Sequence, residues 1–415
     1  MKISVIGAGY VGLVTGACFA KLGNEVVFID KDEEKLEAAN NRISPIYEEG
    51  LDELLGQIRI EVSTDYRKAL TSDVIFICVG TSSDESGTVF LEHIKEATRQ
   101  IAGILKAKEG YCVVAVKSTV TPGSTEELVI PILETSGKKV GRDFGVCMCP
   151  EFLREGKAIY DFMNPARVVI GEHDKRSGDM LLELYGDFKA PVLRTDLTTA
   201  EMIKLASNAF LATKISFINE IGNICKNLGI DTYEVARGMG LDDRIGNSFL
   251  NAGIGFGGSC LPKDLKMLMA KAREAGYEPA ILEEVLNLND AQALQLVEVL
   301  KKHVRLKGAV IGLLGLAFKP ETDDVRDSRA IKIVEALLEE GAVVKACDPM
   351  AVENFRKLFP QVEYVSKEEV LNADAVLIVT EWEEYNNLDY KGKIVIDGRR
   401  VLKAKEARIY EGVCW

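Results

Sequence analysis

The glycine-rich segment GAGYVG at residues 7–12 constrains the fold of this chain more than any other feature. It follows the apolar run 3–6 and precedes a helical stretch, and Asp30 closes the next apolar run, 25–29. The first glycine permits a tight turn, the second lets a pyrophosphate approach the backbone, and the third allows helix and strand to pack closely. Because a helix N-terminus also stabilises phosphates, this pattern predicts a dinucleotide-binding βαβ unit.

Asp30 selects between the two nicotinamide dinucleotides. Its carboxylate accepts a hydrogen bond from a ribose 2′-OH and repels a 2′-phosphate, so the predicted cofactor is NAD rather than NADP. The alternative is a tight turn in a cofactor-free α/β domain. A second glycine pair, in the segment GLLG at 312–315, follows another apolar run without the full pattern. We therefore predict that this later segment does not bind NAD.

Apolar runs alternate with amphipathic stretches through the first half of the chain, a pattern typical of a parallel α/β sheet. Residues 198–228 then form one long helical stretch without proline, and helical sequence continues to about residue 302. A second alternation of strands and helices follows. The predicted fold class is α/β, with two Rossmann-like parallel-sheet domains joined by a long central helix and a helical middle region. The predicted domains are 1–196, 197–303 and 304–415.

Bulk composition excludes several classes of partner. The 415 residues are too many for one hydrophobic core. The formal net charge of -13, without a long run of Lys or Arg, argues against nucleic acid and anionic membrane surfaces. No apolar stretch reaches the ~18 residues that cross a bilayer. Nine cysteines without a framework spacing, and only three histidines, indicate a cytoplasmic chain with reduced thiols and no metal site.

Polar segments follow three of the predicted strands, as GTS at 80–82, ST at 118–119 and CPE at 149–151. In open α/β sheets, ligands bind outside the carboxyl ends of the strands. We therefore expect Glu151, and Glu155 four residues later, to face a ligand. The alternative is that either glutamate only caps or borders a loop.

The segment GIGFGGSCLPKD at 253–264 contains the predicted nucleophile. Its glycines allow a ligand to approach the backbone, and Pro262 fits the first turn of a helix, which places Cys260 near that helix's N-terminus. The helix dipole and the adjacent Lys263 both favour the thiolate. Asp264 lies one helical turn from Cys260 on the same face. Because core packing does not require such a glycine-rich run, we predict that Cys260 is catalytic and the other eight cysteines are core residues.

Lys204 and Asn208, on the long helical stretch, are also four residues apart and share a face. Both side chains can donate hydrogen bonds to a developing oxyanion, which is a large term in acyl chemistry. By spacing alone, however, the pair is more typical of a solvated helix face.

Six segments occur in order over essentially the whole chain: GAGYVG, KSTV, PEFLREG, EMIKLASNAF, FLNAGIGFGGSCLPKD and FKPETDDVRDS. On these segments the chain resembles the UDP-glucose/GDP-mannose dehydrogenases, and GFGGSCLPKD is highly specific. The resemblance implies a four-electron oxidation that uses two NAD and converts a nucleotide-sugar alcohol, through an aldehyde, to a uronic acid. It also implies that 304–415 binds the UDP-sugar and that 197–303 forms a dimer contact.

Within this family, UDP-glucose is favoured over GDP-mannose as the substrate. The segments RIG at 244–246, FLNAG at 249–253 and DGR at 397–399 resemble the UDP-glucose enzymes. The stretch STVTPGS and the C-terminal EGVCW resemble the GDP-mannose enzymes instead, and PEFL in place of PER speaks against the N-acetylated hexosamine branch. The prediction is UDP-glucuronate formation, with GDP-mannuronate formation as the alternative.

The resemblance assigns six catalytic residues. Cys260 attacks the C6 aldehyde to form a thiohemiacetal, which a second hydride transfer converts to a thioester. The remaining roles are a general base for thioester hydrolysis (Glu151), stabilisation of the oxyanion (Lys204, Asn208) and organisation of catalytic water (Asp264, Thr119).

The resemblance also implies two sets of binding residues, in which cations face pyrophosphate and Arg forks face phosphate or carboxylate. The predicted NAD contacts are Gly7, Gly9, Tyr10, Val11, Gly12, Asp30, Lys35, Thr81, Ser118, Thr119, Glu155, Lys263 and Arg326. The predicted substrate contacts are Glu151, Phe152, Leu153, Arg154, Glu155, Lys204, Asn208, Arg244, Phe249, Leu250, Asn251, Ala252, Gly253, Gly257, Phe318, Lys319 and Arg399. We expect Arg244 to reach the site of a neighbouring subunit in a homodimer or larger homo-oligomer. For Arg326 and Arg399, which lie among other charges, surface ion pairing is the alternative.

Two other classes of function compete with this interpretation. A non-catalytic NAD-binding protein with a redox-sensing Cys260 binds the cofactor without turnover, but it leaves Glu151, Lys204, Asn208 and Asp264 unexplained together. A simple two-electron dehydrogenase tolerates Cys260→Ser and produces one NADH per sugar.

Overall fold

The computed structural model describes residues 1–84, 87, 89–186 and 188–415. The chain divides into two compact units. The first unit comprises Met1–Ser207 and Lys266–Ala275, and the second comprises Asn208–Leu265 and Gly276–Trp415. In this described part of the chain, no helix is long and apolar enough to span a membrane.

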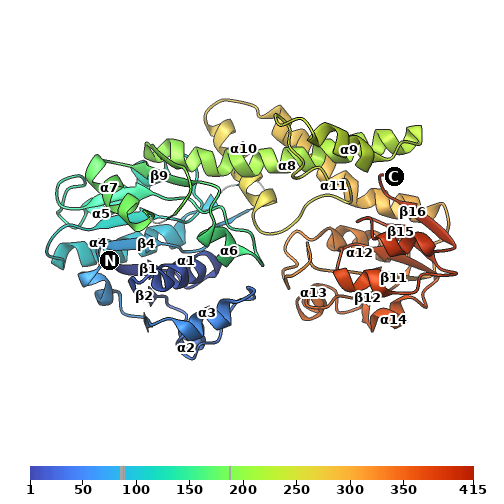
Figure 1. The fold of residues 1–415 in the computed structure, drawn as a ribbon, viewed down its shortest axis with the longest axis horizontal. Helices are drawn as coiled ribbons and strands as arrows, with labels where there is room; N and C mark the ends of the chain where they lie inside the picture. The colour runs from blue at the N-terminus through green and yellow to red at the C-terminus, as the bar shows by residue number, and fades with distance from the viewer. Residues whose placement is uncertain (85–86, 88, 187) are drawn as a thin grey trace. The chain divides into compact units, whose positions relative to one another are not determined.

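The first unit is built on an eight-stranded sheet in the order β10-β9-β8-β7-β4-β1-β2-β3 (Figure 1). The order reverses between β1 and β4, which is the point where open α/β sheets bind ligands. The predicted parallel sheet is present, but β9 pairs antiparallel with β8, so β9 and β10 run against the other strands. The strands are β1 Lys2–Ile6, β2 Glu25–Ile29, β3 Ile60–Ser63, β4 Val74–Ile77, β7 Val113–Val116, β8 Gly145–Met148, β9 Val168–Glu172 and β10 Val192–Thr195, with a separate hairpin of β5 Ser82–Ser83 and β6 Val89–Phe90.

Helices cover both faces of this sheet because the central strands are apolar on both sides. On β4, Val74 and Phe76 belong to one core, and Ile75 and Ile77 belong to the other. The first core takes residues from α1, α3, α6 and α7, and the second takes residues from α4 and α5. The helical segments are α1 Tyr10–Lys21, α2 Glu33–Asn40, α3 Leu51–Gln57, η1 Tyr66–Thr71, α4 Glu92–Ala107, the π-helical turn η2 Thr125–Val129, α5 Ile130–Glu134, α6 Ala158–Met163 and α7 Lys175–Leu184.

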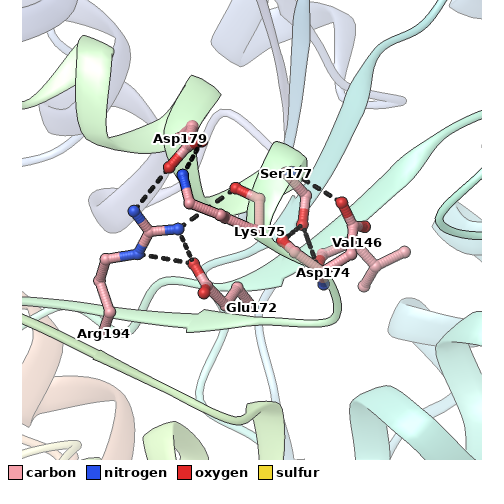
Figure 2. A network of polar contacts seen from close by, with 7 residues as sticks. All are labelled: Val146, Glu172, Asp174, Lys175, Ser177, Asp179 and Arg194. Carbon is pink, nitrogen blue, oxygen red and sulfur yellow. Dashed lines mark hydrogen bonds and ion pairs between the residues drawn. The ribbon is translucent and has the colours of Figure 1, made fainter.

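Charged side chains tie the antiparallel edge of the sheet to α7 (Figure 2). Arg194, on β10, donates to Glu172 at 2.8 Å and to Asp179 at 2.6 Å. Asp174 and Ser177 form a capping box at the N-terminus of α7, and Ser177 Oγ also donates to the carbonyl oxygen of Val146. These contacts fix the edge strands β9 and β10 against α7.

The second unit contains a fully parallel six-stranded sheet in the order β13-β12-β11-β14-β15-β16. Its core joins the sheet to Ile218 of α8 and Leu296 of α11, so the helical middle and the C-terminal sheet bury apolar surface together. The strands are β11 Val310–Leu314, β12 Val343–Cys347, β13 Glu363–Tyr364, β14 Ala375–Ile378, β15 Ile394–Asp397 and β16 Ile409–Gly412. The helical segments are α9 Thr232–Gly240, α11 Ala280–Lys301, α12 Arg329–Glu339, α13 Val352–Leu358, α14 Lys367–Val370, η3 Glu383–Asn387 and η4 Leu402–Glu406.

Two helices belong to both units. α8 (Leu197–Leu228) is the long helix predicted over 198–228, and α10 (Leu261–Glu274) begins directly after Cys260, where Pro262 predicted a helix start. The two Rossmann-like domains and the long central helix are therefore confirmed.

Candidate active site

The glycine turn between β1 and α1 has the geometry that its spacing predicts. Gly7 has φ +102°, and its N–H donates to the carbonyl oxygen of Ile29 at 2.8 Å. A Cβ atom on Gly12 would lie 1.9 Å from the carbonyl oxygen of Gly7, so the helix and the turn can approach only without it. A Cβ atom on Gly9 would meet nothing within 4 Å, which leaves the backbone open to a ligand.

The carboxylate of Asp30 holds the turn and retains capacity for a further hydrogen bond. It accepts from the N–H of Ala8 at 2.6 Å and from the N–H of Asp32 at 3.0 Å. A carboxylate has about four lone-pair sites, so a ribose hydroxyl can still donate to it. Lys35 lies nearby on α2 and forms an ion pair with Asp32 at 2.9 Å.

The corresponding turn in the second unit shares the positive φ of its turn glycine but differs in the surroundings of that glycine and of the nearby carboxylate. Gly312 lies within β11 rather than after it, and the turn is made by Gly315, with φ +100°. A Cβ on Gly315 would lie 2.4 Å from that of Thr380. The carboxylate at the end of β12, that of Asp348, accepts five hydrogen bonds from protein donors. The absence of spare acceptors supports the prediction that this turn does not bind a dinucleotide.

Residues at the end of β4 lie beside the glycine turn, because β4 neighbours β1 in the sheet, and β7 is the next strand beyond β4. Ser118 is buried, and its hydroxyl donates to the carbonyl oxygen of Val79 at 2.7 Å. Thr81 and Thr119 are partly exposed at the same strand ends. The three polar segments predicted to face a ligand thus follow the adjacent strands β4, β7 and β8.

Glu151 follows β8 and forms a buried ion pair with Lys204 of α8. Its Oε1 lies 2.8 Å from Lys204 Nζ, and its Oε2 accepts from the N–H of Leu153 at 2.6 Å. Burial raises the pKa of Glu151, but the charge and hydrogen bond of Lys204 outweigh this effect, so its pKa is lowered. The solvated helix face that spacing alone favoured for Lys204 and Asn208 is wrong, because these side chains are only 3% and 8% exposed.

Two buried charged residues, Glu201 on α8 and Lys117 after β7, lie outside the predicted site. Glu201, one turn before Lys204 on α8, accepts from the N–H groups of Gly123 and Thr125 at 2.6 and 2.8 Å. Burial raises the pKa of Glu201. Lys117 Nζ lies 3.4 Å from the carbonyl oxygen of Cys149, and its charge further lowers the pKa of Glu151. In the sequence, Lys117 could have been noticed as a charged residue in an apolar run, and Glu201 as a charged residue on the helix face that carries Lys204.

In the second unit, Cys260 is partly exposed immediately before α10. The N–H of Asp264 donates to the carbonyl oxygen of Cys260 at 2.9 Å, which places the two residues one helical turn apart, as predicted. Asp264 is buried, and its carboxylate accepts from Asn208 at 2.6 Å and from Lys263 at 2.6 Å. The positive charge of Lys263, which was expected to favour the Cys260 thiolate, is therefore partly balanced by the carboxylate of Asp264.

The glycine-rich loop before Cys260 packs against the segment FKPETDDVRDS at 318–328. A Cβ atom on Gly257 would lie 2.2 Å from the carbonyl oxygen of Asp327, and one on Gly258 would lie 2.7 Å from the Phe318 ring. The N–H of Gly258 donates to the carbonyl oxygen of Arg326 at 2.9 Å. The structure thus brings the predicted segments 253–260 and 318–327 together.

Several predicted binding arginines form ion pairs with nearby carboxylates. Arg326 contacts Asp324 at 2.7 Å, and Arg244 contacts Asp242 at 2.6 Å. Arg154 contacts Asp161 at 2.6 Å, and Arg399 lies 3.3 Å from Glu381. Of the remaining predicted residues in the first unit, Tyr10 and Val11 begin α1, the centroid of the Phe152 ring lies 5.6 Å from Lys204 Nζ, and Glu155 is partly exposed. In the second unit, Phe249 has φ +64°, Asn251 is exposed, and Leu250 and Ala252 are buried. The N–H of Gly253 donates to Asn219 Oδ1, and Lys319 Nζ lies 5.7 Å from the centroid of the Phe318 ring.

Comparison with known proteins gives a match over almost the whole chain. The models of the UDP-glucose/GDP-mannose dehydrogenase family match residues 1–189 (NAD binding domain), 198–291 (central domain) and 312–404 (UDP binding domain). The UDP-glucose 6-dehydrogenase AglM of Haloferax volcanii is 42% identical, with 100% of both chains covered. The UDP-glucose 6-dehydrogenase TuaD of Bacillus subtilis is 45% identical, with 98% of this chain and 90% of that protein covered.

Solved structures show the same relationship. A UDP-glucose dehydrogenase from Pyrobaculum islandicum is 44% identical, with a TM-score of 0.96, and covers 100% of this chain and 98% of its own. A GDP-mannose dehydrogenase from Pseudomonas aeruginosa is 37% identical, with a TM-score of 0.59 and full coverage of both chains.

Alanine at two of the turn glycines separates folding from binding. We expect Gly12→Ala to lower the free energy of unfolding by about 1–3 kcal/mol, because its Cβ overlaps the Gly7 carbonyl, and to abolish NAD binding. We expect Gly9→Ala to leave the unfolding midpoint unchanged but to weaken NAD affinity by more than about tenfold, because its Cβ fills the open approach to the backbone. Thermal unfolding and NAD titration measure both effects. Wild-type NAD affinity in Gly9→Ala would show that the dinucleotide lies elsewhere.

Proposed function

Because the chain belongs to the UDP-glucose/GDP-mannose dehydrogenase family, we propose that it oxidises UDP-glucose to UDP-glucuronate with two molecules of NAD. The observation that carries this proposal is Cys260 at the start of α10, one turn from the buried Asp264. The curated relatives named UDP-glucose 6-dehydrogenases, at 42% and 45% identity, support UDP-glucose as the substrate.

The glycine turn and Asp30 fit NAD. The open backbone at Gly9 and the N-terminus of α1 suit a pyrophosphate, and the spare acceptor capacity of Asp30 suits a ribose hydroxyl. When bound, NAD accepts one hydride in each of the two oxidations. The other proposed cofactor contacts are Tyr10, Val11, Lys35, Thr81, Ser118, Thr119, Glu155, Lys263 and Arg326.

Covalent catalysis by Cys260 divides the second oxidation into easier steps. After the first oxidation, the thiolate adds to the C6 aldehyde, and the resulting thiohemiacetal loses a hydride to become a thioester. Water then attacks the thioester carbon, the carbon–sulfur bond breaks, and the uronate leaves while the thiol is regenerated. The position of Cys260 at a helix N-terminus supports this role, since the helix dipole favours the thiolate.

Glu151 acts in the hydrolysis as the general base. The lowered pKa that Lys204 imposes keeps Glu151 ionised at neutral pH, so its carboxylate can accept the proton of the attacking water. Lys204 and Asn208 donate hydrogen bonds to the oxyanion of the tetrahedral species. Asp264 and Thr119 orient the water.

The three-part organisation follows from these roles. We propose that 1–196 binds NAD, that 197–303 supplies the helical and dimer-forming part, and that 304–415 binds the UDP-sugar. The family models over 1–189, 198–291 and 312–404 support this division. The nine cysteines are thiols in the described chain, which supports a reducing, cytoplasmic location.

A substrate panel tests the proposed reaction. With NAD and either UDP-glucose, GDP-mannose or UDP-N-acetylmannosamine, we expect UDP-glucose to give two NADH per sugar and an acidic product. Cys260→Ser should stop at or before the aldehyde, because it lacks the thiolate. Absorbance at the NADH band and mass spectrometry of the product measure both. One NADH per sugar, or uronate production by Cys260→Ser, contradicts the mechanism, and GDP-mannose turnover alone identifies the alternative substrate.

We also propose a homodimer formed through α8. Phe210, Phe217 and Ile224 are seven residues apart on this helix and are 64%, 46% and 50% exposed. Residues at this spacing lie near one face, so they form an apolar stripe that a second copy can cover. Arg244, exposed beside Asp242, is then available to the neighbouring subunit's site.

Charge placed in the stripe tests the dimer. We expect Phe217→Glu to shift the protein from dimer to monomer in sedimentation velocity, because it buries a carboxylate at the contact. Leu402→Glu, which also replaces an exposed hydrophobic residue, serves as control and should remain dimeric. A monomeric wild type, or a dimeric Phe217→Glu, contradicts the proposal.

A further inference from the structure

We propose that Glu48 is a positioning residue that holds the glycine turn and the Glu151 loop, residues 151–157, in a fixed arrangement. This inference rests on the proposed function, because it assigns Glu48 a part in that reaction. Glu48 lies between α2 and α3, outside every predicted site segment, and it is only 6% exposed. A carboxylate this buried requires hydrogen-bond donors around it.

The donors come from two segments that are distant in sequence. The hydroxyl of Tyr10, the first residue of α1, donates to Glu48 Oε2. The N–H of Gly156 donates to the same oxygen at 2.8 Å, and the N–H of Ala158 donates to Oε1 at 2.6 Å. Gly156 N also lies 3.0 Å from the hydroxyl of Tyr10. One carboxylate thus joins the glycine turn to the loop that carries Glu151.

Hydrogen bonds within the loop 151–157 couple the position of Gly156 to that of Glu151. The N–H of Leu153 donates to Glu151 itself at 2.6 Å, and Arg154 is held by Asp161 through its N–H and its side chain. The hydroxyl of Tyr10 also lies 3.4 Å from the carbonyl oxygen of Arg154. Because only four residues lie between Glu151 and Gly156 and several of them are hydrogen-bonded, a shift at Gly156 displaces the carboxylate of Glu151.

The chemistry of the cluster requires an anionic acceptor. A carboxylate offers lone pairs on both oxygens and has no hydrogen to donate, which matches a phenol and two peptide N–H groups. Burial raises the pKa of Tyr10, and the hydrogen bond to Glu48 raises it further, so the phenol remains a donor. In Glu48→Gln, one oxygen becomes an NH₂ group that faces other donors. This near-isosteric change therefore removes at least one of the hydrogen bonds to Glu48 without removing side-chain volume.

Capping of α6 is the simpler role for Glu48, since Ala158 is the first residue of that helix. The contact with Tyr10 goes beyond capping, because Tyr10 belongs to the segment that faces the cofactor. Tyr10→Phe removes this one hydroxyl and keeps the bonds from Glu48 to the N–H groups. Glu49 supplies a matched control, because it is the adjacent glutamate, it is exposed, and it lines the same surface pocket as Glu48, Arg154 and Gly156.

The test compares Glu48→Gln, Tyr10→Phe and the double variant with the wild type and with Glu49→Gln. We measure kcat, KM and Kd for NAD, and the midpoint of thermal unfolding. Glu48→Gln should lower kcat and raise Kd for NAD by about tenfold each, because small displacements of reacting groups are costly. Tyr10→Phe should show part of both effects, and the double variant should be no worse than Glu48→Gln. Glu49→Gln should match the wild type.

A lower unfolding midpoint with unchanged kcat and unchanged Kd in Glu48→Gln overturns the inference and leaves a structural cap. If Glu48→Gln does not fold, Tyr10→Phe decides, since wild-type kcat and Kd in that variant also overturn it. If the wild type does not oxidise UDP-glucose, the proposed function fails on its own. The Kd for NAD, and amide exchange at Gly156 and Ala158 in Tyr10→Phe, then still support or overturn the connection.

Discussion

The ion pair between Lys204 and Glu151 is the interaction on which the proposed chemistry depends most. Both side chains are almost fully buried, and the cost of removing two charges from water is several kcal/mol per ion unless each is paired and hydrogen-bonded. Lys204 and the N–H of Leu153 supply those partners to Glu151. Packed apolar side chains of equal volume often stabilise a fold as well as such a pair does. The arrangement is therefore better explained by a need for an ionised carboxylate in a dry site.

One face of α8 carries three buried polar side chains, each of which binds a residue distant in the sequence. Glu201, Lys204 and Asn208 are three and four residues apart, a spacing that places them on the same side of a helix. Glu201 accepts from Thr125, which lies 76 residues away in the sequence. Lys204 binds Glu151, 53 residues away, and Asn208 donates to Asp264, 56 residues away. Within the first unit, α8 thus holds the segments after β7 and β8, and within the second unit Asn208 holds the first turn of α10.

Local sequence patterns predicted those parts of the candidate site whose geometry depends on a few neighbouring residues. The glycine spacing predicted the turn at Gly7, and Pro262 predicted the start of α10 beside Cys260, because both depend on the backbone of a few neighbouring residues. The burial of Lys204 was not predictable from spacing, since a helical period shows which residues share a face but not what covers it. The antiparallel pairing of β9 and the hydrogen bonds that Glu48 and Glu201 accept depend on contacts between distant segments, which a single sequence does not reveal.

The ionisation of Glu151 tests the account most directly. Infrared spectra of protein labelled with ¹³C-glutamate, with Glu151→Gln to assign the band, can follow its titration in the wild type and in Lys204→Met. We predict that wild-type Glu151 has a pKa below its ordinary value, so that it is ionised at neutral pH and the stability it contributes is lost only as pH falls through that lowered value. In Lys204→Met, burial should dominate and raise the pKa above the ordinary value. Titration of Glu151 at the same pH in both proteins would contradict the account.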